Sequence, residues 1–70
     1  MWILNQKRTS IARINYVCKS LKNNEIIVAS EDGAELVFGK FDTEQRAKEV
    51  VDEIWIDIKH GSTFYEMPDE

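Results

Sequence analysis

The fold is decided by residues 25–38, EIIVASEDGAELVF, which are typical of two β-strands joined by a turn. Both flanking runs are rich in β-branched and aliphatic residues, and Asp32-Gly33 between them is a strong short-range signal of a hairpin. A two-residue turn at this point would place Ala29 opposite Leu36. The sequence therefore predicts an antiparallel hairpin in the middle of the chain.

Further strands are predicted upstream of this hairpin. Asparagine tolerates left-handed backbone angles, so Asn23-Asn24 predicts a second two-residue turn, which would place Lys19 opposite Val28. Residues 2–4 form a short apolar run, and residues 9–16 predict a strand with a bulge or bend near Arg13.

This register predicts the two faces of the sheet, because successive side chains along a strand point to opposite sides. The face predicted to receive a helix carries Cys18, Ser20, Ile27, Ala29, Leu36 and Phe38. The opposite face carries Lys19, Leu21, Ile26, Val28, Ser30, Glu35 and Val37. That second face is more apolar than a solvated surface requires. Either the N-terminal strands curl over it as a half-barrel, or it meets a partner.

Residues 43–59 predict the single helix, with Asp42 as its N-cap, Gln45 three residues later and Gly61 as a natural stop. Apolar residues at helical spacing predict one buried stripe: Ala47, Val50, Val51, Ile54 and Ile58. A short final strand is predicted at about residues 63–67. The predicted fold class is α+β: an antiparallel meander of about four strands at residues 1–40, one C-terminal helix on one face, and the final strand. Its 70 residues predict a single domain, 1–70.

Charge is divided unevenly along the chain. Residues 1–24 hold five Lys or Arg and no acid, whereas residues 25–70 hold all 13 acids against four bases, and the net charge is −4. Two interpretations stay open: solvated faces that aid solubility, or a field directed at a partner. A negative net charge disfavours a duplex-binding module, since phosphate contacts dominate such binding.

Catalytic chemistry is poorly represented in the sequence. The single cysteine, Cys18, excludes an intramolecular disulfide, and the N-terminus lacks the order of a signal peptide, so we expect a cytoplasmic protein without a membrane segment. Cys18 is expected to be a packing residue and His60 a helix-end residue. We therefore expect no enzyme activity, metal site or cofactor.

Two surfaces are candidates for binding. Ile56 lies opposite the buried stripe among acidic residues, and Trp55 lies at the edge of the stripe, whereas Trp2 and Phe64 are expected in the core. The candidate protein-binding residues are Glu49, Glu53, Trp55, Ile56 and Asp57. The alternative is a basic surface for nucleic acid, with Tyr16 beside Lys7, Arg8, Arg13, Lys19 and Lys22. Self-assembly as a homodimer, through an open strand edge or Ile56, is a third hypothesis.

Residues 2–6 (WILNQ), 41–50 (FDTEQRAKEV) and 65–68 (YEMP) together resemble short uncharacterised proteins common in Gram-positive bacteria and their phages. The resemblance implies a mobile-element setting, in which small acidic proteins often block a larger host protein. The expected function is therefore a non-enzymatic, acidic protein-binding module of phage or prophage type. It would occupy a surface of a larger host protein, as an inhibitor or an adaptor.

Overall fold

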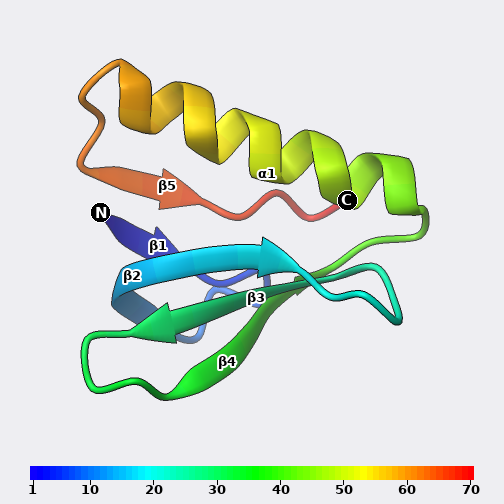
Figure 1. Cartoon of the computed structure of the whole chain (residues 1–70), viewed down its shortest axis with the longest axis horizontal. Helices are drawn as coiled ribbons and strands as arrows, with labels where there is room; N and C mark the ends of the chain where they lie inside the picture. Colours follow the sequence, from blue (N-terminus) through cyan, green and yellow to red (C-terminus); the bar gives the residue numbers. More distant parts are fainter.

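A computed structural model describes all 70 residues as a five-stranded sheet with one helix packed on it (Figure 1). In chain order the elements are β1 (Trp2–Leu4), β2 (Ile11–Lys19), β3 (Glu25–Ser30), β4 (Glu35–Lys40), α1 (Glu44–Lys59) and β5 (Phe64–Glu66). The strand order across the sheet is β4-β3-β2-β1-β5, in which β5 runs parallel to β1 and the other neighbouring pairs are antiparallel. The predicted α+β fold is confirmed, and the final strand makes the sheet mixed.

The long strand β2 bends where its pairing changes (Figure 1). Its first half pairs with β1 and its second half with β3, and the register shifts between Ile14 and Tyr16, which leaves Asn15 as the extra residue. The predicted bulge near Arg13 is therefore found two residues later. The predicted face that carries Ile26 and Val28 is covered by α1 and not by the N-terminal strands, because β1 and the first half of β2 extend the same open sheet.

One side chain links the sheet's separate ends. The backbone N–H of Gln6, in the β1–β2 loop, donates to the carbonyl of Phe38 (2.8 Å), and its Oε1 accepts from the N–H of Lys40 (2.8 Å). Its Nε2 donates to the carbonyls of Pro68 (3.1 Å) and Asp69 (2.8 Å). Gln6 therefore ties the loop to the edge of β4 and to the C-terminal segment.

The β3–β4 hairpin turns at the predicted position but with a longer loop. Ser30 donates its N–H to the carbonyl of Ala34, and Gly33, at φ 88°, donates its N–H to the carbonyl of Ser30. The loop therefore has three residues, 31–33, a common hairpin form with glycine in the left-handed position. It pairs Ala29 with Glu35, so the predicted pairing with Leu36 is wrong by one residue.

This one-residue change decides which face is buried. The observed register places Leu36 and Phe38 on the same face as Ile26 and Val28, whereas the predicted register separated these bulky residues. Ile26 and Val28 are fully buried and Phe38 is 4% exposed, so this face packs under α1. The predicted helix-facing positions on β3, Ile27 and Ala29, lie on the outer face instead.

The β2–β3 connection is also longer than predicted. Ser20 donates its N–H to the carbonyl of Glu25, so the loop holds four residues, 21–24, rather than the Asn23-Asn24 pair alone. The pairing shifts by two residues, which places Lys19 opposite Ile26 and Cys18 opposite Ile27. Because the pairing shifts by an even number of residues, the side chains of β2 and β3 that were predicted to share a face still share it.

The helix begins after Thr43, whose Oγ1 accepts from the N–H of Arg46 (3.1 Å), so the N-cap is one residue later than predicted. Ile58, predicted in the buried stripe, is 45% exposed. The buried core consists of Ile3, Ile26, Val28, Phe38, Phe41, Ala47, Val50, Ile54, Tyr65 and Met67, with Val51 partly buried against it. No helix has the length and hydropathy needed to span a membrane.

Candidate functional site

The outer face of the sheet, away from α1, carries an apolar patch at the β5-β1-β2 end. Trp2 is paired with Phe64 on β5 and with Arg13 on β2, and the next outward row joins Leu4 to Ile11. Trp2 is 48% exposed, Ile11 65% and Phe64 66%. We call Trp2, Leu4, Ile11 and Phe64 the outer patch; they line a shallow hollow of about 300 Å³.

Two ion pairs border this patch. The Nε of Arg13 lies 3.0 Å from a carboxylate oxygen of Glu31, and the Nη1 of Arg8 lies 3.7 Å from one of Glu66. Each pair joins a base from the first 24 residues to an acid from the rest of the chain. The charge division along the sequence is therefore partly cancelled in space, and the patch has matched charges at its rim.

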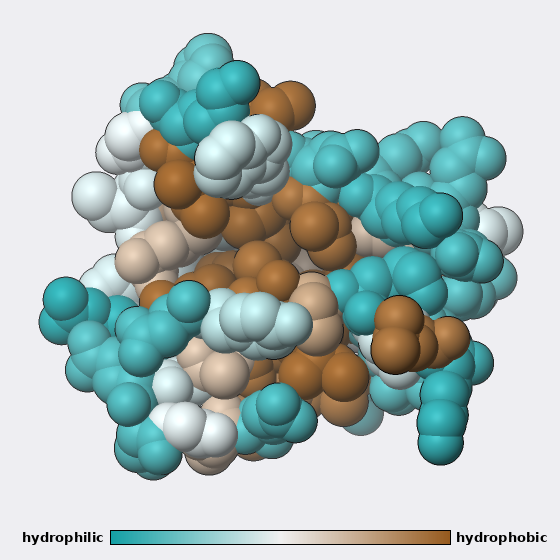
Figure 2. Space-filling view, in the orientation of Figure 1, coloured by the Kyte–Doolittle hydropathy of each residue, from teal (hydrophilic) through white to brown (hydrophobic).

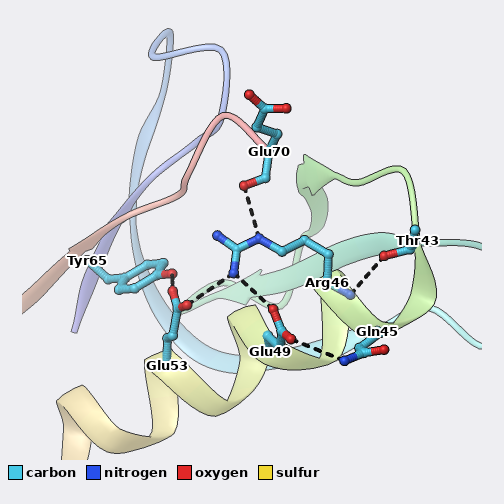
Figure 3. Close-up of polar contacts among 7 residues, drawn as sticks. All are labelled: Thr43, Gln45, Arg46, Glu49, Glu53, Tyr65 and Glu70. Carbon is cyan, nitrogen blue, oxygen red and sulfur yellow. Dashed lines mark hydrogen bonds and ion pairs between the residues drawn. The ribbon is translucent and has the colours of Figure 1, made fainter.

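The acidic side of α1 is organised by Arg46 (Figure 3). Arg46 Nη1 lies 3.4 Å from Glu49 Oε1 and 3.1 Å from Glu53 Oε2, and its Nε donates to the carbonyl of Glu70 (3.0 Å). Tyr65, on β5, donates its hydroxyl to Glu53 Oε1 (2.9 Å). Glu49, Glu53 and Asp57 follow one another at four-residue spacing, where like charges repel. Arg46 offsets this repulsion at Glu49 and Glu53, although Arg46 and Glu53 are seven residues apart.

The environment of Tyr65 shifts its titration. Burial raises the pKa of the Tyr65 hydroxyl, and its hydrogen bond to the Glu53 carboxylate raises that pKa further. The same carboxylate, through its hydrogen bond, raises the pKa of Arg46. Tyr65 and Arg46 therefore hold their protons in this network and fasten β5 and the C-terminus to the helix.

Only part of the predicted helix site comes together. Glu49, Glu53 and Asp57, which we call the acidic flank, lie on the side of α1 that Arg46 and Tyr65 contact, and Ile56 (51% exposed) is their neighbour in the chain. Trp55 is two positions from both Glu53 and Asp57 in the chain, which is roughly 200° around the helix. Trp55 therefore lies on the opposite side of α1 from the acidic flank. It is 58% exposed, and Lys59 Nζ lies 5.9 Å from its ring centroid.

The predicted basic surface is dispersed. Arg8 and Arg13 lie at the outer patch in ion pairs, whereas Lys19 lies on the helix-facing side of β2 and donates to the carbonyls of Ser20 and Asn23. Lys7 and Lys22 lie in different loops. The five side chains therefore do not share one surface with Tyr16.

A second apolar region opens between α1 and the sheet, visible as a brown band in Figure 2. Met1, Ile14 and Val17 are partly buried against the core and line one hollow with the exposed Ile58. This seam is continuous with the core, so its apolar character follows from packing alone.

Sequence reasoning missed the outer patch. Trp2 and Phe64 were expected in the core, but Ile3 and Tyr65 are buried in their place, and strand alternation turns their neighbours outward. Strand alternation could have revealed the outer patch, because Trp2-Ile3-Leu4 and Phe64-Tyr65 place large apolar residues on both faces of a strand.

The remaining candidate residues do not form a site. Cys18 lies on the outer face of β2, and His60 caps α1. No group of His, Cys, Asp and Glu has the arrangement of a metal site. Compared with known proteins, the chain matches no family model, no curated protein and no solved structure.

Proposed function

We propose that this chain is a non-enzymatic protein-binding module whose contact surface is the outer patch. The observation that supports it is the exposure of Trp2, Ile11 and Phe64, each about half or more exposed, in adjoining rows of one sheet face. Fully burying a large apolar side chain is worth roughly 1.5–3 kcal/mol. A partner that covers Ile11 and Phe64 would therefore gain a substantial part of its binding free energy from this patch.

The composition of the surface suits a protein partner. Tryptophan and arginine are enriched among the residues that dominate protein interfaces, and here Trp2 and Arg13 lie side by side. The ion pairs of Arg8 and Arg13 supply a polar rim around the apolar centre. A standard interface covers roughly 800 Å² on each partner. The whole chain exposes 4852 Å², so an interface of that size would cover roughly one sixth of its surface.

The role we propose is occupation of a surface on a larger protein, as an inhibitor or an adaptor. The small size and net charge of −4 favour a binding module over a chain with its own active-site cleft. The resemblance to short proteins of Gram-positive bacteria and their phages supports a host protein as the target, and the unpaired Cys18 suits a reducing cytoplasm. That setting stays a prediction.

Affinity capture from a Gram-positive bacterial lysate, with quantitative mass spectrometry, tests the proposal. The informative variant is Phe64→Lys, and its matched control is Leu21→Lys, because Leu21 is apolar and 99% exposed but lies in the β2–β3 loop. We expect Phe64→Lys to lose the captured protein and Leu21→Lys to retain it, with both folded by circular dichroism. Equal capture by both variants would contradict the proposal, and loss with Ile56→Lys alone would move the site to the helix.

A further inference from the structure

The strand β5 is an open edge of the sheet whose backbone groups have a defined direction. Trp2 donates its N–H to the carbonyl of Thr63 (2.8 Å), and Met67 donates its N–H to the carbonyl of Leu4 (3.0 Å). In a parallel pair with this pattern, residues 63, 65 and 67 face the neighbouring strand. The N–H and C=O groups of Phe64 and Glu66 therefore point away from β1, toward the side where no strand lies.

The other edge of the sheet is less available. Along β4, Gln6 already accepts from the N–H of Lys40 and donates to the carbonyl of Phe38, which closes the end of that strand. A new strand at β4 would be stopped after Val37 by the β1–β2 loop. No comparable contact covers the outward side of Phe64 and Glu66, and both residues are exposed.

Different chemistry lies on the two sides of the β5 edge. On the outer side, Phe64 continues the outer patch through its row with Trp2. On the helix side, Tyr65 reaches the acidic flank, where Glu49 and Glu53 keep 52% and 48% of their side-chain surface exposed. Arg46 is the one base paired with these carboxylates, so the acidic flank keeps an excess of negative charge.

We propose that β5 receives an extended segment of a partner protein, which adds a strand to the sheet and whose side chains alternate between apolar and basic. The inference rests on the proposed function and specifies how the partner meets the outer patch. Successive side chains of a strand point to opposite faces, so one set joins Phe64 and the other faces Glu53 and Asp57. The backbone groups of Phe64 and Glu66 supply the hydrogen bonds that set the register.

The test is a titration of the ¹⁵N-labelled chain with a seven-residue, end-blocked peptide of alternating Lys and Val. Two peptides serve as controls: one with the same four Lys and three Val in separate blocks, and one with Glu in place of Lys. We expect the alternating Lys–Val peptide to shift the amide signals of β5 and β1 most and to bind at least about tenfold more tightly than either control. Equal binding by the block peptide, equal binding by the Glu peptide, or no shift on β5 would each overturn the inference.

Two variants isolate the backbone contact. Glu66→Pro removes an N–H that the sheet itself does not use, a substitution that edge strands tolerate, and Glu66→Gln keeps it. Both variants remove the Glu66 carboxylate and only Glu66→Pro removes the N–H, so we expect Glu66→Pro to bind the peptide about tenfold more weakly than Glu66→Gln. Equal affinities would overturn strand addition. If Glu66→Pro does not fold, hydrogen exchange of the parent decides: peptide must protect the amides of Phe64 and Glu66, and unchanged exchange overturns the inference.

The failure of this inference can be told apart from the failure of the proposed function. A partner retained by Glu66→Pro and lost by Phe64→Lys would leave the outer patch as the site and remove strand addition. A second copy of the chain is the competing occupant of the edge. Sedimentation of the parent without peptide would then show a dimer that Glu66→Pro abolishes, and this result would also overturn the inference.

Discussion

Replacing Gln6 with alanine should destabilise the fold well beyond what a partly exposed polar residue normally contributes. The backbone hydrogen bond from the Gln6 N–H to the carbonyl of Phe38 would persist. Three side-chain hydrogen bonds would be lost: the one that Gln6 Oε1 accepts from the N–H of Lys40, and the two that Gln6 Nε2 donates to the carbonyls of Pro68 and Asp69. These bonds connect three segments that no regular pairing joins. Their loss frees the end of β4 and the C-terminus together.

The magnitude follows from the number and exposure of these bonds. A typical hydrogen bond contributes about 0.5–1.5 kcal/mol net. Two of the three are exposed and one is part-buried, so we expect a loss of about 1.5–3 kcal/mol in total. A chain of 70 residues has a free energy of unfolding of about 3.5–10 kcal/mol. The expected drop in Tm is about 6–24 °C.

Thermal unfolding followed by circular dichroism measures the total effect, and amide hydrogen exchange locates it. The N–H of Lys40 is bonded to Gln6 Oε1, so its exchange should accelerate more than that of the β3 amides. Gln45→Ala is the matched control, because its amide makes a single exposed contact of 3.5 Å to Glu49. A Tm within about 2 °C of the parent, or unchanged protection at Lys40, would refute the reasoning.

Three further outcomes are expected. Gly33→Val should cost about 1–2 kcal/mol, because Gly33 has φ 88° and a β-branched residue resists that conformation; an unchanged Tm would contradict the turn. Ile54→Ala should cost about 2–5 kcal/mol in urea unfolding and Ile56→Ala should be close to neutral, because Ile54 is fully buried and Ile56 is 51% exposed; similar losses would mean that the helix is rotated. The raised pKa of Tyr65, due to burial and to Glu53, predicts stability that is fully present below about pH 10 and lost as pH rises above it, since the unfolded tyrosine ionises first. Tyr65→Phe should remove that alkaline loss, and an equally steep loss in the variant between pH 9 and about pH 11 would show another cause.

The helix and the central hairpin could be predicted from the sequence because both have a strong local signal. The helix follows from the spacing of Ala47, Val50 and Ile54, and the hairpin follows from Asp32-Gly33 between two β-rich runs. The register could not be predicted in the same way. Asp32-Gly33 suits a two-residue turn and the end of a three-residue loop equally well, since both place glycine at a positive φ. One extra residue in the loop then reverses the faces of β4 relative to β3.

The candidate site was only partly predictable for a related reason. Exposed helix residues such as Ile56 were found because helical periodicity does not depend on strand register. The pairing of Arg46 with Glu53 depends on the path of a long side chain across two turns, which no short spacing rule describes. The outer patch depends on which residue of each short strand is buried, and three-residue strands carry too little periodicity to decide that.

The pattern of β1 and β5 is itself an argument for a partner. A strand with one buried and one solvated face normally alternates apolar with polar residues, whereas a strand covered on both faces is apolar throughout. Trp2, Ile3 and Leu4 are all apolar, and Phe64 and Tyr65 are both aromatic. The helix covers Ile3 and Tyr65, but no element of the chain covers Trp2 and Phe64. The three residues of β1 and the pair Phe64-Tyr65 therefore have the composition of a doubly covered sheet, as expected if a partner covers the outer patch in the way we propose.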